Sequence, residues 1–524
     1  MDSRRIMFLF LTALLMLLVG CSEATPSPTA GPLPTEITVI REDASPGPAT
    51  EVGVEVTIEA TSTQTGGDEP TGGPPAATFT PGPTALPAPF QGESIMGIEL
   101  IGPNFGSQAG LVANAGGFWV RWNAVLWSAI EPVEGDRVWG ALGLFEQQIL
   151  SLASQNLVPI VIVRSTPAWA QGESGSFCGP IRSDALDNFA LFLNELVARY
   201  SAPPFNIKYW ELGNEPDVDP RLVPPEQAFG CWGDEDDAFY GGAGYAEMLR
   251  AAYPAIKAAD PEAQVLIGGL LLDCDPVNPP ETSPGSGVPK NCTPSKFLEG
   301  ILSSGGGDFF DGVSFHAYDL YDPNSGLFGN PNWNSGYTLS GLNSVLVPKV
   351  RFIKSVLATY GHSDKYLINT ETALLCGRTG DEPECNTGAH TRMKTDYVVM
   401  SYTSAVAEGL VGNIWFTLDR PWRRSALTES SGASTSAYVA YQFVAQQLEG
   451  AAFWGNAAEF EGVTGYKFRR GEVEFWVIWS LDSAPHTIEL SEMPAALYDS
   501  VGTQLQPAQT LEISVSPIYV MFGP

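Results

Sequence analysis

The chain has 524 residues, of which 59 are Asp or Glu and 27 are Lys or Arg, giving a formal net charge of −32. This charge excludes nucleic acid as a partner, because a polyanion is repelled, and it suits a neutral substrate or an exported, soluble protein. The length allows one large domain and a smaller one.

The N-terminus has the pattern of an export signal. Arg4 and Arg5 precede the apolar run Ile6–Val19, which is too short for a comfortable membrane span. The run ends in Leu-Val-Gly-Cys21, which resembles the lipobox of bacterial lipoproteins. That resemblance implies a signal peptide over residues 1–20, lipidation of Cys21, and an extracytoplasmic protein anchored to a bacterial membrane by lipid alone. The alternative is an ordinary signal peptide with a chance cysteine.

Residues 21–92 are rich in Pro, Thr, Gly and Ser and contain almost no aromatic side chains. Such a segment buries too little apolar surface to offset the entropy of ordering its backbone. We expect a disordered, semi-extended linker here.

From residue 93 to 450, short apolar strands alternate with amphipathic helical stretches. The alternation predicts a (β/α)8 TIM barrel, and a doubly wound open sheet is the structural rival. The rival fold usually carries a Gly-rich first loop, which the chain lacks. The eight predicted strands are Ile95–Leu100, Phe118–Trp122, Val158–Val163, Ile207–Leu212, Gln264–Gly268, Gly312–His316, Tyr366–Thr370 and Gly412–Thr417.

Three helices are well marked between and after these strands. Apolar residues recur at three- and four-residue spacing over Asp184–Tyr200, after Ser183 as an expected N-cap. Leu342–Tyr360 has a similar pattern and stops at Gly361, which suits a left-handed C-terminal position. The last helical pattern, Ser436–Leu448, ends near Gly450.

Residues 451–524 change to alternating apolar and polar positions, as in half-buried strands. The alternation predicts a small antiparallel β domain that supports the barrel or binds glycans. Its predicted strands are Thr464–Phe468, Glu472–Trp479, Thr487–Leu490 and Leu511–Val515.

Six cysteines remain after Cys21, and they allow fifteen disulfide pairings. Proximity in the chain favours Cys376 with Cys385 and Cys274 with Cys292, which leaves Cys178 with Cys231, but the sequence does not fix the pairing. A zinc site is disfavoured because there is no CxxC pair and the chain has only four histidines. We expect neither a metal nor a cofactor.

Two glutamates occupy matching places in the repeat. Glu215, in Asn214-Glu215-Pro216, follows the fourth predicted strand, and Glu371 follows the seventh. Strands four and seven face each other across a barrel mouth, so both side chains can converge there. Two carboxyl groups about 5–5.5 Å apart suffice to cleave a glycosidic bond with retention.

The motifs around these glutamates carry a family resemblance. Tyr-Trp-Glu-Leu-Gly-Asn-Glu-Pro over Tyr209–Pro216 resembles the strand-four signature of clan A retaining glycoside hydrolases, and Thr370-Glu371 resembles their strand-seven site. The resemblance implies that Glu215 is the acid/base and Glu371 the nucleophile.

Further positions extend this resemblance along the barrel. His316-Ala-Tyr318 is similar to the clan's strand-six His-x-Tyr, and Trp415 to the strand-eight tryptophan under the sugar. The stretch Trp127–Gly135, with Glu131-Pro132 inside it, and Thr166–Trp169 resemble the β-xylosidase and α-L-iduronidase family. That family usually has a tryptophan where this chain has Leu212-Gly213.

Each neighbouring residue has a functional and a plain structural interpretation. Arg121 and the Tyr318 hydroxyl are expected to stabilise ionised Glu371, although Arg121 also suits a core ion pair. Asn214 is placed for the sugar 2-hydroxyl or as a loop cap, and His316 for the site or as a satisfied core residue. Candidate sugar platforms are Trp127, Trp169, Trp232, Trp333, Trp415 and Trp422. Further acids near the mouth are Glu99, Glu211 and Asp217.

The sequence therefore predicts a retaining O-glycoside hydrolase acting on an extracellular oligo- or polysaccharide, with β-linkage expected. A non-catalytic glycan-binding lipoprotein and a transglycosidase using the same residues are the alternatives. Neither the sugar nor the oligomeric state follows from the sequence.

Overall fold

The computed structural model describes residues 94–101, 105–224, 229–281, 290–333 and 344–523. The signal peptide, Cys21 and the linker predicted for residues 1–92 lie outside these ranges. Within the described ranges, no helix combines the length and the apolar character that crossing a membrane requires.

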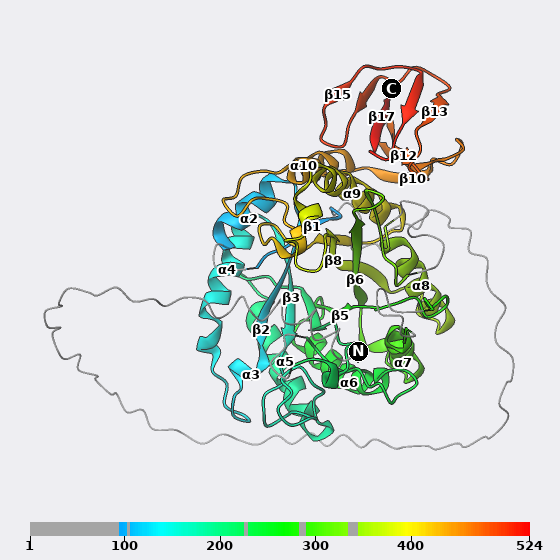
Figure 1. Cartoon of the computed structure of the whole chain (residues 1–524). Coiled ribbons are helices and arrows are strands. Elements are labelled where there is room, and N and C mark those ends of the chain that lie inside the picture. Colours follow the sequence, from blue (N-terminus) through cyan, green and yellow to red (C-terminus); the bar gives the residue numbers. More distant parts are fainter. Residues whose placement is uncertain (1–93, 102–104, 225–228, 282–289, 334–343, 524) are drawn as a thin grey trace, which may run out of the picture. The chain divides into compact units, whose positions relative to one another are not determined.

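Eight parallel strands close into a barrel, which confirms the predicted fold class (Figure 1). The strand order is β5-β4-β3-β2-β1-β9-β8-β6, and pairing of β5 with β6 closes the ring. The barrel strands are β1 (Met96–Glu99), β2 (Trp119–Leu126), β3 (Val158–Arg164), β4 (Tyr209–Asn214), β5 (Gln264–Leu270), β6 (Gly312–Asp322), β8 (Tyr366–Leu375) and β9 (Gly412–Trp415). Their near-continuous apolar sequences fit a parallel sheet that is buried on both faces.

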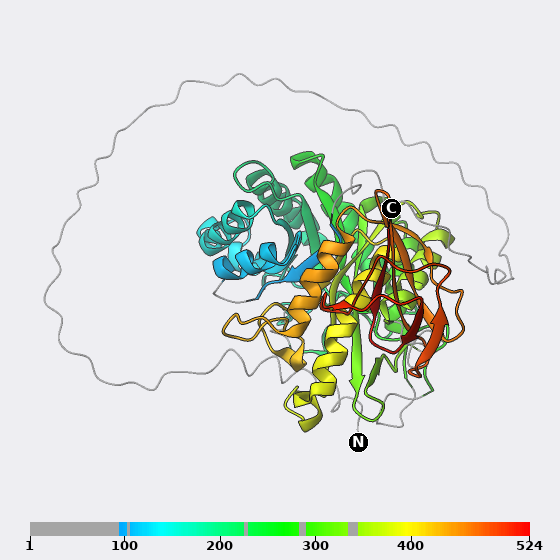
Figure 2. The ribbon, with the colours of Figure 1, turned by 90° about the horizontal axis from the view of Figure 1, so that it is seen from above.

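At least one helix follows each strand, and the longer helices cover the outside of the barrel (Figures 1 and 2). In α5, Phe189, Leu193, Leu196 and Tyr200 form a buried face against the strands. These helices are α2 (Phe105–Asn114), α4 (Gly143–Ser154), α5 (Leu186–Tyr200), α6 (Gly242–Ala259), α7 (Phe297–Ser303), α8 (Leu346–Thr359), α9 (Gly388–Ala407) and α10 (Ser436–Leu448).

Several predicted boundaries change in the structure. Ser183 does not cap α5: it begins a 3-10 turn (η3, Ser183–Ala185), and Ala185 precedes the helix without a side-chain cap. Gly361 follows α8 with φ +81°, as predicted. The strands β6 and β8 run past their predicted ends because their ladder continues to the pair Leu320–Leu375.

The C-terminal residues form the predicted antiparallel β domain. A six-stranded sheet has the order β10-β11-β12-β17-β14-β15, beside the β13–β16 pair. The strands are β10 (Ala452–Asn456), β11 (Val463–Arg470), β12 (Val473–Ser480), β13 (His486–Glu489), β14 (Ala496–Tyr498), β15 (Gln504–Leu505), β16 (Thr510–Ile513) and β17 (Ile518–Phe522). Alternation predicted four of these strands and missed β10, β14, β15 and β17.

The barrel helix α9 contacts this sheet domain through a buried carboxylate. Asp396 accepts hydrogen bonds from the hydroxyls of Ser500, at 2.6 Å, and Ser516, at 2.7 Å. Burial raises the pKa of Asp396 to about 6, and the two hydroxyls oppose that rise. The contact ties the β domain to the helix that follows β8.

All three disulfides lie in loops that follow the C-terminal ends of barrel strands. Cys178–Cys231 links the loops after β3 and β4, Cys274–Cys292 closes part of the loop after β5, and Cys376–Cys385 closes the loop after β8. The pairing that chain proximity favoured is the one present.

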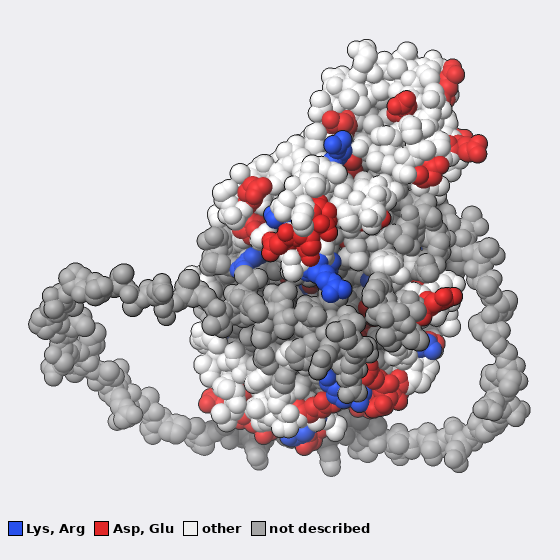
Figure 3. All heavy atoms as spheres, viewed as in Figure 1, with Lys and Arg blue, Asp and Glu red and all other residues white. Residues whose placement is uncertain are grey.

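Acidic side chains are more prominent than basic ones on the face shown in Figure 3.

The disulfides differ in the length of chain that they close, 53 residues for Cys178–Cys231 and 9 for Cys376–Cys385. Loop-closure entropy predicts that removing the longer link lowers the free energy of unfolding by about 4 kcal/mol, and the shorter link by about 3 kcal/mol. Urea unfolding of the double variants Cys178→Ser/Cys231→Ser and Cys376→Ser/Cys385→Ser tests this order. A greater loss from the shorter link would contradict it.

Candidate active site

A single guanidinium organises the C-terminal end of the barrel interior. Arg121 on β2 is fully buried and bonds three glutamates from three other strands. Its Nη1 donates to Glu99 Oε2 at 2.6 Å and to Glu371 Oε1 at 2.5 Å. Its Nε and Nη2 donate to Glu211 at 2.8 and 3.0 Å. Burial of this cluster strengthens each interaction, because water does not screen it.

Asn214 and Tyr318 complete the polar shell around Arg121 and Glu371. The Asn214 Oδ1 atom accepts from Arg121 Nη2 at 2.6 Å, so the amide nitrogen of Asn214 is not used in this contact. The Tyr318 hydroxyl donates to Glu371 Oε2, the oxygen that Arg121 does not contact. Both residues predicted to stabilise Glu371 therefore contact it, one on each oxygen.

The two glutamates predicted for the site come from opposite sides of the barrel. Glu371 lies inside β8 rather than beyond its end, because β8 continues to Leu375. Glu215 directly follows β4 and has a left-handed φ of +51°, which is uncommon outside glycine and typical of a constrained functional position. Its N–H donates to Gly269 O at 2.9 Å, which fixes this conformation.

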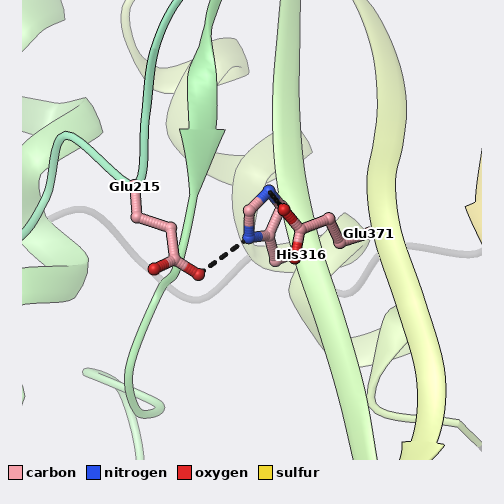
Figure 4. A group of neighbouring side chains, drawn as sticks. All are labelled: Glu215, His316 and Glu371. Atoms are coloured by element: carbon pink, nitrogen blue, oxygen red, sulfur yellow. Dashed lines mark hydrogen bonds and ion pairs between the residues drawn. The ribbon is translucent and has the colours of Figure 1, made fainter. Parts of the chain in front are cut away.

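His316 on β6 lies between Glu215 and Glu371 (Figure 4). His316 Nδ1 is 2.9 Å from Glu215 Oε1, and Nε2 is 3.4 Å from Glu371 Oε1. One ligand-type atom from each of the three side chains lies within 4.8 Å of the others. The two carboxyl groups are therefore neighbours across the barrel mouth.

The surroundings of the two glutamates push their pKa values apart. Burial raises the pKa of Glu215 well above its usual range, and the Glu371 charge and then Asp217 add to the rise. Burial also raises the pKa of Glu371, but Arg121 and the Tyr318 hydroxyl oppose it. Because Glu215 has no contact with the guanidinium, the proton leaves Glu371 first and stays on Glu215.

Burial, reinforced by the charges of Arg121 and Lys349, lowers the pKa of His316 well below its usual value. The ring is therefore neutral and carries one N–H. With Glu215 protonated, its hydroxyl donates to Nδ1, and the ring proton on Nε2 faces the Glu371 carboxylate. This tautomer forms the hydrogen bond at Nδ1 and directs a positive N–H, rather than a lone pair, towards the Glu371 carboxylate 3.4 Å from Nε2.

The donor set of Glu215, His316 and Glu371 would also suit a divalent cation. However, Glu371 Oε1 already accepts from Arg121, whose positive charge would repel a second cation on the same oxygen. The arrangement fits an ion pair with arginine better than a metal site.

The prediction that Trp415 forms a sugar platform is wrong. Its ring is fully buried, 6.0 Å from the Tyr397 ring of α9, and its Nε1 donates to Ser425 O. Alternation along β9 turns the next residue to the other side. Phe416 is half-buried, with its ring centroid 6.1 Å from Tyr318 and 5.3 Å from Trp422. The aromatic group near Glu371 is thus Tyr318, Phe416 and Trp422.

Trp127 is also a packing residue. It is 1% exposed and contacts the α5 rings, and its Nε1 donates to Glu131 Oε2 at 2.6 Å. The buried Glu131 also accepts from Gly135 N at 2.8 Å, and its carbonyl accepts from Trp169 Nε1. The Trp127–Gly135 motif therefore closes a loop after β2. Trp169 is half-buried beside Trp127, while Trp232 and Trp333 are buried.

Sequence reasoning did not find two supporting residues. Gly269 on β5 donates its N–H to Glu211 Oε1 at 2.6 Å, accepts from Glu215 N, and leaves room for the His316 ring. Lys349 on α8 is buried and donates to His316 O and Leu271 O, both at 2.7 Å. A Gly-Gly pair ending a strand was the available signal for Gly269, whereas no local pattern marks Lys349.

Comparison with known structures finds chains of the same fold. A family 39 glycoside hydrolase from Bacteroides cellulosilyticus aligns over 82% of this chain and 81% of its own, with TM-score 0.59 and 18% identity. A conserved exported protein from Bacteroides fragilis gives TM-score 0.55 at 12% identity, covering 82% and 94% of the two chains. A family 30 subfamily 8 xylanase from Clostridium acetobutylicum gives 0.52 at 11%, covering 82% and 96%.

These identities show a shared fold. No protein-family model matches the sequence, and no curated protein sequence matches it.

Gly269→Ala tests whether the glycine is required for the His316 position. A Cβ there would collide with His316 Nε2 and lie 2.9 Å from Thr370 Oγ1, so we expect a destabilisation of about 1–3 kcal/mol. Gly110→Ala in α2 is the matched control, because a Cβ there meets nothing within 4 Å, and it should stabilise by about 0.5–1 kcal/mol. Equal melting temperatures for the two variants would argue against this role of Gly269.

Proposed function

We propose that this protein is a retaining glycoside hydrolase in which Glu371 is the nucleophile and Glu215 the acid/base. The observation that carries the proposal is the pair of neighbouring carboxyl groups with opposed environments. One oxygen of each carboxyl group lies within 4.8 Å of the other, which supports the retaining arrangement, with carboxyl groups about 5–5.5 Å apart, over the inverting one at about 6.5–9.5 Å.

The first step uses the two side chains in the protonation states that burial favours. Glu215 gives its proton to the glycosidic oxygen, and the leaving group departs as an alcohol. A Glu371 oxygen forms a bond to the anomeric carbon while the glycosidic bond breaks, producing a glycosyl ester. Arg121 and Tyr318 hold the Glu371 carboxylate from both sides, which orients it before the substrate arrives.

The second step reverses the roles. Once Glu371 is esterified its negative charge is lost, and the pressure that raised the pKa of Glu215 falls. Glu215, now ionised, takes a proton from water, the water oxygen bonds to the anomeric carbon, and the ester bond to Glu371 breaks. The product keeps the configuration of the substrate at the anomeric carbon, because that carbon is inverted twice.

Asn214 is suited to hold the sugar ring. Its Oδ1 is taken by Arg121, so the amide nitrogen is left to donate to the 2-hydroxyl, a contact that strengthens in an oxocarbenium-like transition state. The half-buried rings of Tyr318, Phe416 and Trp422 offer apolar surface beside Glu371 for the C–H face of a sugar. These contacts support an oligo- or polysaccharide substrate, and we expect a β-linkage.

The structural neighbours support the class of reaction. Two of the three are described as glycoside hydrolases, one of them a xylanase. The paired carboxyl groups favour a catalyst over a glycan-binding protein, since binding alone needs no buried acid that keeps its proton.

We also propose an extracytoplasmic location with a lipid on Cys21. Three disulfides fit an oxidising compartment, and one structural neighbour is described as exported. In this arrangement residues 1–20 are the signal peptide, 21–92 the linker, 93–450 the barrel domain and 451–524 the β domain.

Glu371→Gly should abolish release of phenol from a panel of aryl β-glycosides. Azide should restore part of the turnover, because the small anion attacks from the space that the carboxylate leaves, and the product should be a glycosyl azide of inverted configuration. Glu262→Gln, with its carboxylate on the surface, is the matched control and should retain full activity. Full turnover by Glu371→Gly would contradict the assignment of Glu371 as the nucleophile.

The pH profile of kcat/KM should be bell-shaped, with an acid limb from ionisation of Glu371 and an alkaline limb from loss of the Glu215 proton. Glu215→Ala should lose the alkaline limb. It should also lower kcat about 10²–10⁴-fold for a substrate with a poor leaving group, and far less for a dinitrophenyl glycoside that needs no protonation. An unchanged alkaline limb in Glu215→Ala would show that another group supplies the proton.

A further inference from the structure

The buried cluster around Arg121 holds more carboxyl groups than positive charge. Glu99, Glu211 and Glu371 all bond this one guanidinium, and all three are buried. Three anions on one cation would leave a net charge in the barrel interior, where an unpaired charge costs several kcal/mol. A proton on one of the three carboxyl groups lowers this net charge from −2 to −1 and so reduces the cost of burial.

The hydrogen bonds divide unequally among the three. Glu211 accepts from Nε and Nη2 of Arg121 and from Gly269 N. Glu371 accepts from Arg121 Nη1 and from the Tyr318 hydroxyl. The contact from Arg121 Nη1 at 2.6 Å is the one donor identified for Glu99 among the described residues. Fewer donors stabilise a negative charge on Glu99 than on either of the others.

We propose that Glu99 works as a neutral acid that positions Arg121, so that the charge on Nη1 serves Glu371 alone. This rests on the proposed function, in which Glu371 attacks as the carboxylate. Glu99 and Glu371 share Nη1, so ionised Glu99 would compete for the hydrogen bond that orients the nucleophile. Glu99 is a positioning residue, because it acts through Arg121.

Five barrel strands supply an ionisable group near Glu99. β2 supplies Arg121, β3 Arg164, β4 Glu211, β6 Tyr318 and β8 Glu371. The strand β9, which pairs with β1, contributes no ionisable side chain. Burial raises the pKa of Glu99 to about 8; Arg121 opposes the rise, while Glu371 and Glu211 add to it.

Two substitutions separate a neutral acid from a carboxylate. In Glu99→Gln an amide oxygen can accept from Nη1 without adding charge, whereas Glu99→Ala leaves Nη1 with Glu371 and an empty space beside it. We expect Glu99→Ala to lower kcat on the order of a hundredfold, as a displaced catalytic group does, and Glu99→Gln to restore most of the loss. The acid limb of the pH profile should stay in place in Glu99→Gln. If this variant is as inactive as Glu99→Ala, the proposal is overturned.

A second measurement detects the protonation state of Glu99 without an activity assay. The pKa of about 8 in the folded protein exceeds the value of about 4.3 for an unfolded glutamate, so the folded state holds the proton between these values. Stability from this group is present at low pH and is lost as pH rises towards 8. Relative to Glu99→Gln, the unfolding equilibrium constant of the wild type should rise about tenfold per pH unit across this window.

Melting temperatures of the wild type, Glu99→Gln and Glu262→Gln between pH 5 and 9 give this comparison. We expect the melting temperature of the wild type to fall relative to that of Glu99→Gln as pH rises to about 8, and this difference then to level off. The difference in melting temperature between the wild type and the exposed control Glu262→Gln should stay constant above pH 5.5. A Glu99→Gln difference that is constant over the range would overturn the neutral acid. If the wild type releases no sugar while that difference still grows with pH, the proposed function fails and the protonated Glu99 stands.

Discussion

The arrangement of the site depends on one arginine held in the dry interior of the barrel. Arg121 uses Nε, Nη1 and Nη2 to bond side chains from β1, β4 and β8, so its planar fork fixes the positions of these three strands relative to its own strand, β2. No single strand pair could hold Glu371 in this way. The cost of burying the guanidinium is offset because each of its nitrogens has a carboxylate or amide oxygen beside it.

The same arginine creates the difference between the two candidate catalytic glutamates. Glu371 touches it and Glu215 does not, although both are buried at the same mouth. Neutral His316 contacts both glutamates without adding charge, and Lys349 donates a hydrogen bond to the main-chain carbonyl of His316. Contact with the guanidinium opposes the rise in the pKa of Glu371, whereas burial and the charges of Glu371 and Asp217 raise the pKa of Glu215, so two identical side chains have different affinities for a proton.

The loops around the mouth are held by covalent links, while the strands below them are held by packing. Disulfides join or close the loops after β3, β4, β5 and β8, the side of the barrel on which Glu215 and Glu371 lie. In the outer layer, Asp396 of α9 accepts hydrogen bonds from two serine hydroxyls of the β domain. The helix after β8 therefore contacts the β domain as well as the barrel. These contacts limit the freedom of the strand that carries Glu371.

The sequence by itself determined the eight strand–helix repeats and the two glutamates, because apolar periodicity and short motifs are local properties of the chain. It missed β17, which is apolar without alternation, and the exchange of Trp415 for Phe416, because one residue of register decides which side of a strand faces the mouth. Only the tertiary structure decided that Glu99 and Glu211 share Arg121, and that Gly269 leaves space for His316. Those contacts join residues far apart in sequence, and their charges interact only once the barrel has closed and excluded water.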